Sequence, residues 1–138
     1  MNERWFEIRV YFEDTDFSGR VYHGAFVHFL ERARTEFLRE HGIDHTMLAS
    51  DHDPLFFTLR GLNLSFKGPA FIDDLLAIRT EPGPPGRARL TMMQTVFRDE
   101  SAIASAEVEL CLIDKNGRPR RPPDALRRAF AQHSGDAL

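Results

Sequence analysis

The sequence contains a single cysteine, Cys111, so the chain cannot form an internal disulfide. Cys111 stands among apolar residues, and we expect it to be a buried, reduced thiol of the core. The chain also lacks any apolar run near the ~18–20 residues that a membrane-spanning helix needs. Charged residues in the first ten positions interrupt the apolar run that a signal peptide would require. These absences predict a cytoplasmic protein without a membrane span.

An excess of positive charge is also missing. The formal net charge of −3 argues against general nucleic-acid binding, because a nucleic-acid-binding face is usually basic. Neither GxGxxG nor a Walker-type pattern occurs, so no nucleotide cofactor is expected. A zinc site normally needs three or four ligands, and no cysteine pair supports the histidines that lie near one another in the sequence. We therefore expect no metal at these histidines, which are His41, His45 and His52.

The chain length and the apolar content predict a single domain. With 138 residues, 42% of them hydrophobic, the chain is long enough to bury a core of its own. The densest turn material, EPGPPGR from Glu81 to Arg87, is short enough for a hairpin loop. We therefore expect a single domain over residues 1–138.

Hydrophobic periodicity predicts a strand, a long helix and four more strands. Apolar residues alternate over 5–12, as in a half-buried strand, and recur at helical spacing over 24–40. Gly42 follows this helix as a C-cap. The later strands are predicted over 55–67, 74–81, 87–98 and 102–113, with a bulge near Gly61, and a short terminal helix is predicted from about Asp124.

Short turns join the last four strands, and such turns connect antiparallel neighbours, because a parallel crossover needs a dozen or more residues. The prediction is an α+β fold in which one long helix packs on a curved five-stranded antiparallel sheet. A single layer of this kind leaves an edge strand and some apolar surface open. We therefore expect self-association, at least to a homodimer.

The junction between the first strand and the long helix is rich in polar residues. It reads YFEDTDFSGRVYHGAFVHFLERARTEF from Tyr11 to Phe37, with acids at positions 13, 14 and 16 and a Tyr22-His23-Gly24 triplet. The first N–H groups of a helix have no intrahelical partner, and the macrodipole adds partial positive charge there. Such a helix start stabilises developing negative charge.

This stretch resembles the signature of the hotdog-fold acyl-CoA thioesterases, in particular the branch with 4-hydroxybenzoyl-CoA thioesterase and the thioesterases associated with the Tol–Pal system. The motif covers about a fifth of the chain, and the order of the predicted strands agrees over nearly the full length. The resemblance implies a hotdog fold and a hydrolase that releases a carboxylic acid and free CoA, with coenzyme A present only as part of the substrate. It also implies a homodimer or homotetramer with active sites at a subunit interface.

Matched by position, the resemblance makes Asp16 the catalytic carboxylate, either as a nucleophile or as a general base for water. The backbone N–H that polarises the thioester carbonyl falls on His23, with Tyr22 and Gly24 beside it as substrate-binding positions. Each of these residues also has an alternative role without catalysis. Asp16 would then be a turn aspartate bonded to the local backbone, Tyr22 would pack at the helix start, and the His23 imidazole would be solvated. Asp14 is interpreted as a structural or surface acid.

Other charged residues have weaker assignments. Glu31 is interpreted as a solvated or paired helix residue, and the alternative is a carboxylate that reaches the acyl pocket. Basic residues near the pocket mouth would bind the phosphates of coenzyme A, with ordinary solvated charges as the alternative. The candidates are Arg60, Lys67, Arg87, Arg89 and the run from Arg118 to Arg121.

Phe17, Ser18 and Arg20 differ from the smaller or apolar residues usual at these positions of the family. A larger and more polar junction would reshape the acyl pocket, so specificity for 4-hydroxybenzoyl groups is not inferred. Two other functions stay open: an acyl-thioester hydratase or dehydratase of the same fold, and a non-catalytic module that binds acyl-CoA or acyl carrier protein. Asp16 favours hydrolysis, because binding alone gains nothing from a carboxylate beside a thioester.

Overall fold

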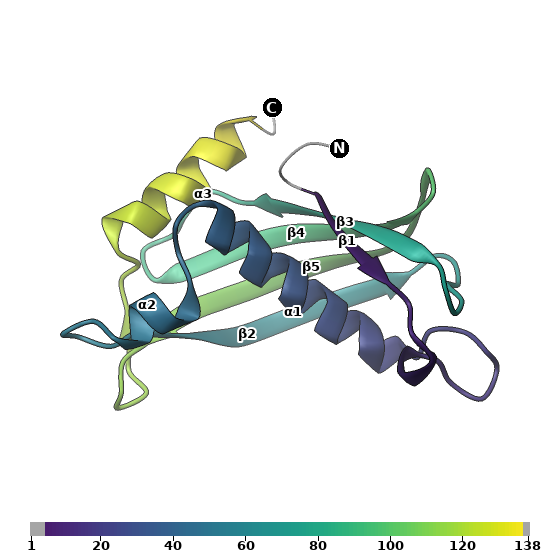
Figure 1. Cartoon of the computed structure of the whole chain (residues 1–138). Coiled ribbons are helices and arrows are strands. Elements are labelled where there is room, and N and C mark those ends of the chain that lie inside the picture. The colour runs from purple at the N-terminus through teal and green to yellow at the C-terminus, as the bar shows by residue number, and fades with distance from the viewer. Residues whose placement is uncertain (1–4, 137–138) are drawn as a thin grey trace.

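The computed structural model describes residues 5–136, with side chains up to residue 131. One long helix lies across a curved sheet, and the helices labelled α2 and α3 lie toward one end of that sheet (Figure 1). None of the described helices is long and apolar enough to cross a membrane. The strands are β1 (Trp5–Arg9), β2 (Phe56–Phe66), β3 (Leu75–Pro82), β4 (Arg89–Arg98), β5 (Ser101–Ile113) and β6 (Pro119–Arg120), and the helices are the 3-10 turn η1 (Phe12–Asp14), α1 (His23–Glu40), α2 (His45–Ala49) and α3 (Asp124–Asp136).

The sheet follows the order β1-β3-β4-β5-β2, and every pairing in it is antiparallel. This confirms the predicted α+β hotdog architecture. The expected bulge is also present, because the register of β2 against β5 shifts between Leu59 and Gly61. A sixth strand, β6, pairs with the end of β5 and corrects the expected count of five. A strand of two residues is too short to produce an alternating pattern.

Two further differences from the sequence-based expectation have local causes. The first strand ends at Arg9, because Asp14 accepts a hydrogen bond from the Tyr11 N–H at 2.8 Å and turns the chain into η1. The helix α2 was not predicted, since five residues carry too little periodicity. It begins at a capping aspartate, Asp44, which accepts the Met47 N–H at 2.7 Å.

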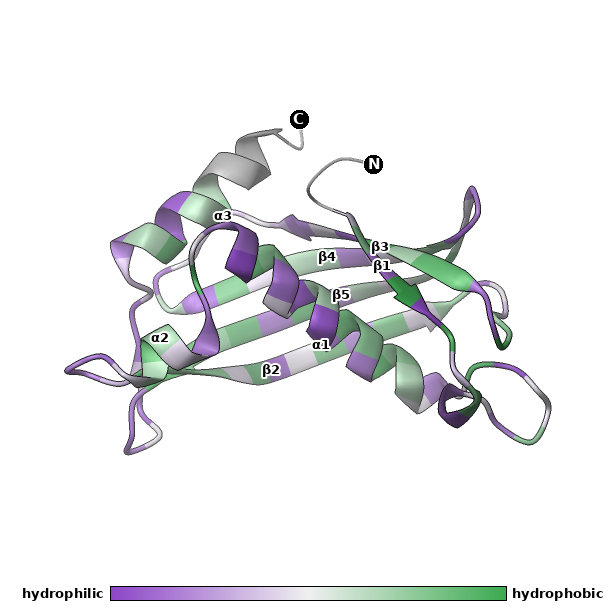
Figure 2. Cartoon of the chain, viewed as in Figure 1, coloured by the Kyte–Doolittle hydropathy of each residue, from purple (hydrophilic) through white to green (hydrophobic). Residues whose placement is uncertain are grey.

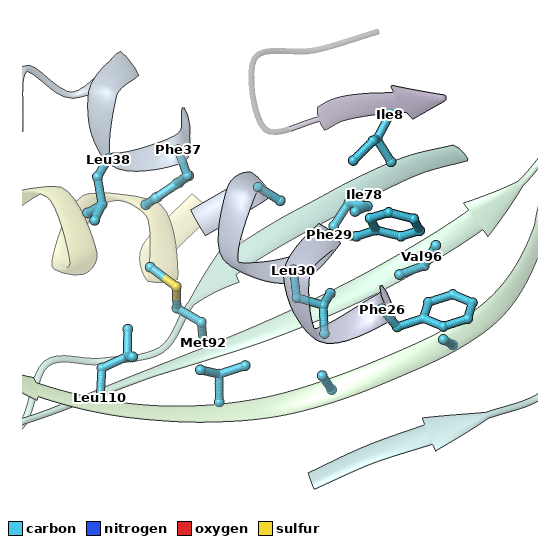
Figure 3. Close-up of a cluster of buried hydrophobic side chains, with 14 of the residues drawn as sticks. Ile8, Phe26, Phe29, Leu30, Phe37, Leu38, Ile78, Met92, Val96 and Leu110 are labelled. Atoms are coloured by element: carbon cyan, nitrogen blue, oxygen red, sulfur yellow. The ribbon is translucent and has the colours of Figure 1, made fainter. Parts of the chain in front are cut away.

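Helix α1 spans 18 residues, about 27 Å, and its apolar side faces the sheet. Hydrophobic and hydrophilic residues alternate along it (Figure 2). Phe26, Phe29 and Leu30 are buried, and the Phe29 ring lies beside Ile78 of the sheet (Figure 3). Each such buried side chain stabilises the fold by ~1.5–3 kcal/mol. The helix ends as predicted, because the residue Gly42 follows it with a φ of +75°.

A buried polar network fastens α1 to the sheet. Gln94, on β4, is fully buried, and its amide nitrogen donates to the Leu30 carbonyl and to the Thr80 hydroxyl, both at 3.0 Å. Its amide oxygen accepts from the Arg34 guanidinium at 3.1 Å. The network bonds one residue of the sheet to two consecutive turns of the helix, so it opposes sliding of α1 along the sheet.

Candidate active site

The loop that leads into α1 is a tight chain reversal at one end of the sheet (Figure 1). The Asp16 N–H donates to the Arg20 carbonyl at 2.8 Å, and the Gly19 N–H donates back to the Asp16 carbonyl at 3.0 Å. Gly19 has a φ of +83°, a conformation that favours glycine. The Val21 N–H donates to the Ala70 carbonyl at 2.8 Å. The loop is therefore closed on itself and attached to the segment that follows β2.

The carboxylate of Asp16 is exposed at this turn. Its Oδ1 accepts hydrogen bonds from the Ser18 hydroxyl at 2.6 Å and from the Ser18 N–H at 2.8 Å. These two bonds, the hydroxyl bond first, lower the pKa of Asp16 from its ordinary value. The group is consequently an accessible carboxylate that stays ionised at neutral pH.

The start of α1 offers unpaired backbone donors. Tyr22 precedes the helix in an extended conformation and provides no side-chain cap. The Ala25 N–H donates to the Tyr22 carbonyl at 2.9 Å, whereas the N–H groups of His23 and Gly24 have no acceptor among the residues that the structure describes. Together with the macrodipole, these two donors favour negative charge in front of the helix.

The side chains around this helix start are packed closely. The Tyr22 ring lies against the His23 imidazole, with 4.2 Å between the ring centroids. A Cβ atom at Gly24 would come within 2.5 Å of the Tyr22 ring, so glycine lets the ring lie across the first turn. The Tyr22 N–H donates to the Asp14 carbonyl at 2.8 Å, which fits the structural interpretation of Asp14.

A cavity of about 380 Å³ lies along α1, between this helix and β2. Its lining begins at Val27, one helical turn after His23, and includes Glu31, which agrees with the alternative assignment of Glu31 to a pocket. Sequence reasoning did not anticipate the polar residues Arg34 and His45 in this wall. The lining consists of Val27, His28, Glu31, Arg34, Thr35, Leu38, His45, Phe57, Leu59 and Leu110.

His45 belongs to α2, whereas most of the wall comes from α1, so the sequence did not indicate that His45 lines this cavity. Its imidazole lies 3.3 Å from the Thr35 hydroxyl and meets the Phe57 ring edge-on, with centroids 5.7 Å apart.

The described residues hold no group of three or more His, Cys, Asp or Glu side chains that could bind a metal ion.

The basic candidates lie at different ends of the sheet. Lys67 follows the end of β2 that reaches the start of α1, where the Phe66 and Phe26 rings are 5.4 Å apart. Arg89 lies at the opposite end, where β4 begins opposite Cys111, and pairs with a glutamate of β5. Arg120 is held by two carboxylates, Asp53 and Asp114, so it is already neutralised.

A curved antiparallel sheet around one long helix defines the hotdog class of folds, and here an exposed carboxylate lies on the turn before the helix start. Residues 18–105 match the model of the Thioesterase superfamily. The chain belongs to this family and is a thioester hydrolase. The matched region contains His23 and Gly24, whereas Asp16 lies just before it.

Similar proteins agree with this assignment. The Acyl-CoA thioester hydrolase YbgC of Escherichia coli O6:H1 is 36% identical over 131 residues, which cover 94% of this chain and 96% of that protein. The Acyl-CoA thioesterase YbgC of Haemophilus influenzae is 34% identical over 126 residues, or 91% and 92% of the two chains. The crystal structure of a probable thioesterase from Bartonella henselae superposes with a TM-score of 0.84 at 45% identity, covering 86% of this chain and 98% of the other.

Proposed function

We propose that the protein hydrolyses acyl-CoA thioesters with a short-chain or aromatic acyl group, releasing the free acid and CoA. The observation that carries this proposal is the junction itself. An ionised, exposed carboxylate at Asp16 stands on a closed turn before a helix whose first N–H groups are unpaired. The named activities of the relatives from Escherichia coli and Haemophilus influenzae support the same class of substrate.

The chemistry follows from these groups. The thioester carbonyl oxygen accepts the His23 N–H, which stabilises negative charge as the carbonyl carbon is attacked. Asp16 either attacks this carbon itself, forming an anhydride that water then hydrolyses, or removes a proton from the attacking water. The thiolate of CoA leaves readily, because a thiol has a pKa of ~8.5.

We assign the acyl group to the cavity between α1 and β2. Its volume of about 380 Å³ lies at the low end of the ~300–1,000 Å³ usual for ligand pockets, which suits a short or aromatic acyl group. Val27, Leu59 and Leu110 supply apolar walls, while Glu31 and Arg34 make one side polar. For the phosphates of coenzyme A, Lys67 is the candidate at the same end of the sheet as Asp16.

We also propose that the active form is at least a homodimer. Strand β2 forms one edge of the sheet in the described part of the chain and carries exposed apolar residues. Leu59 and Phe66 are 44% and 49% exposed. Pairing of two such edges would bury these side chains and satisfy the free backbone groups of the strand. Contact with an acyl carrier protein stays a prediction.

A panel of acyl-CoA substrates tests the proposed function. Thiol release is measured with short-chain, medium-chain and aromatic acyl-CoAs, and the same preparation is assayed for addition of water to an enoyl-CoA. We expect thiol release with the short-chain or aromatic members and no hydration. Absence of thiol release across the panel, or hydration of the enoyl-CoA, would contradict the proposal.

A further inference from the structure

Ser18 lies two residues after Asp16, on the same turn. Both of its hydrogen-bond donors reach one oxygen of the Asp16 carboxylate: the hydroxyl is 2.6 Å from Oδ1 and the backbone nitrogen is 2.8 Å from it. The Arg20 N–H is a further, weaker donor to this carboxylate. The two close hydrogen bonds hold Oδ1 to the turn, and no described residue makes a comparably close bond to Oδ2.

The direction of the Ser18 hydroxyl is determined by its surroundings. An ionised carboxylate only accepts hydrogen bonds, so the hydroxyl must donate to Asp16. The N–H of Arg20 lies 3.4 Å from the same hydroxyl oxygen and donates to it. The hydroxyl is thus held from both sides, and the carboxylate cannot rotate without breaking a short hydrogen bond.

We propose that Ser18 is a positioning residue for thioester hydrolysis, because its hydroxyl holds the Asp16 carboxylate with Oδ2 presented to the substrate. This inference rests on the proposed catalytic role of Asp16. A group fixed in its reactive orientation reacts faster than one that must first be oriented.

The hydroxyl has a second consequence, at acidic pH. A hydrogen bond to the ionised form lowers the pKa of a carboxyl, and the Ser18 hydroxyl is the largest cause of the lowered pKa of Asp16. At neutral pH the carboxylate is ionised with or without Ser18, so the gain there is geometric. Below that range Ser18 keeps more of Asp16 in its reactive form, and activity extends to lower pH.

The test compares Ser18→Ala, which removes the hydroxyl but keeps the N–H, with Ser18→Thr, which retains a hydroxyl. For Ser18→Ala we expect turnover at neutral pH to fall roughly tenfold, the effect of losing one hydrogen bond to a charged group, with little change in KM. The acidic limb of kcat/KM should move to higher pH, because the pKa of Asp16 rises. Ser18→Thr should restore both properties.

A second readout does not depend on turnover. In protein labelled with 13C at aspartate carboxyl groups, the Asp16 signal is assigned by its loss in Asp16→Asn, and its titration midpoint is compared among variants. We expect a higher midpoint in Ser18→Ala and a midpoint near that of the parent in Ser18→Thr. Ser50→Ala is the matched control, because the Ser50 hydroxyl makes a single bond, to the Met47 carbonyl, at an exposed helix end.

An unchanged turnover, pH profile and Asp16 midpoint in folded Ser18→Ala would overturn the role of Ser18. The proposed function would survive that result, provided that Asp16→Asn is inactive. Full activity of Asp16→Asn would instead overturn the role of Asp16, and with it the positioning role of Ser18. Melting curves of each variant separate these outcomes from loss of the fold.

Discussion

Asp14 and Asp16 belong to the same turn, yet the backbone uses them differently. Asp14 accepts the Tyr11 N–H through its carboxylate and the Tyr22 N–H through its carbonyl, so it holds the two ends of the loop together. The carboxylate of Asp16 makes its two close hydrogen bonds to Ser18 and remains exposed. This difference supports a structural role for Asp14 and is consistent with the reactive role proposed for Asp16.

The variant Asp16→Asn tests the reactive role. The amide keeps the size of the carboxylate but loses its charge and basicity, so turnover should fall at least ~100-fold. Binding of the substrate and thermal stability should change little, because the side chain is exposed. Asp14→Asn is the companion variant, and its turnover should fall far less. A severe loss in Asp14→Asn with an active Asp16→Asn would reverse the two assignments. Thiol-release kinetics and melting curves supply both measurements.

The backbone donor at His23 can be removed by proline. His23 is the first helical residue, where proline is well tolerated, and Tyr22 before it already has the extended conformation that proline requires, with φ −64° and ψ 138°. His23→Pro should therefore fold but lose ~100–1,000-fold in kcat, as when one oxyanion donor is deleted. His23→Ala keeps the N–H and should be much milder. If His23→Ala is as inactive as His23→Pro, the imidazole is the functional group.

At the scale of elements, the position of α1 depends on more than apolar burial. Buried Phe and Leu side chains hold the helix against the sheet by close packing. Gln94 adds contacts with specific directions through its hydrogen bonds to Leu30, Arg34 and Thr80. The junction at the start of α1 is thereby placed relative to the sheet.

Replacing Gln94 with methionine tests this network. The side chain keeps a similar volume but leaves the Thr80 hydroxyl and the Arg34 guanidinium without their partner, so the free energy of unfolding should decrease by ~1–3 kcal/mol. The neighbouring residue Met93 faces outward and is 42% exposed, and Met93→Gln should stay within ~0.5 kcal/mol of the parent protein. Urea denaturation measures both. Equal effects of the two changes would show that the network contributes nothing beyond side-chain volume.

At the scale of the whole molecule, the exposed edge of β2 and the cavity beside it belong together. Leu59 lies both on this edge strand and in the lining of the cavity. A second copy paired along β2 would lie beside this cavity and shield it from water. The proposed assembly would therefore affect the environment of the acyl group as well as the stability of the fold.

Light scattering of the purified protein should report at least twice the 15.9 kDa of one chain at micromolar concentration. Leu59→Lys should shift the protein toward the monomer, because two-fold pairing would bring like charges together at a buried contact. Met93→Lys adds the same charge to the outer face of the sheet and should leave the β2 contact intact. A parent protein that is monomeric under these conditions would contradict the proposed dimer.

The sequence by itself determined the elements whose signals are local. The apolar spacing over 24–40 and Gly42 after it indicate a helix that the structure places at His23–Glu40, and Gly61 marks the bulge in β2. The motif with Asp16 and His23 likewise lies within one short stretch, so the resemblance to the family could assign these two positions from the sequence. Local interactions determine these features, so they can be predicted from the sequence without knowledge of tertiary contacts.

Tertiary structure decided what depends on distant partners. Arg34 meets Gln94 across 60 positions of the sequence, and this contact exists only in the register that brings β4 under α1. The cavity wall combines α1 with His45 and with Phe57 from an edge strand, and no periodicity records that meeting. Even the bond from Ser18 to Asp16 needs the closed turn at Gly19 to bring the hydroxyl to one carboxylate oxygen. The sequence determines which side chains are present, but the orientation and the neighbours of each side chain are determined only when the chain has packed.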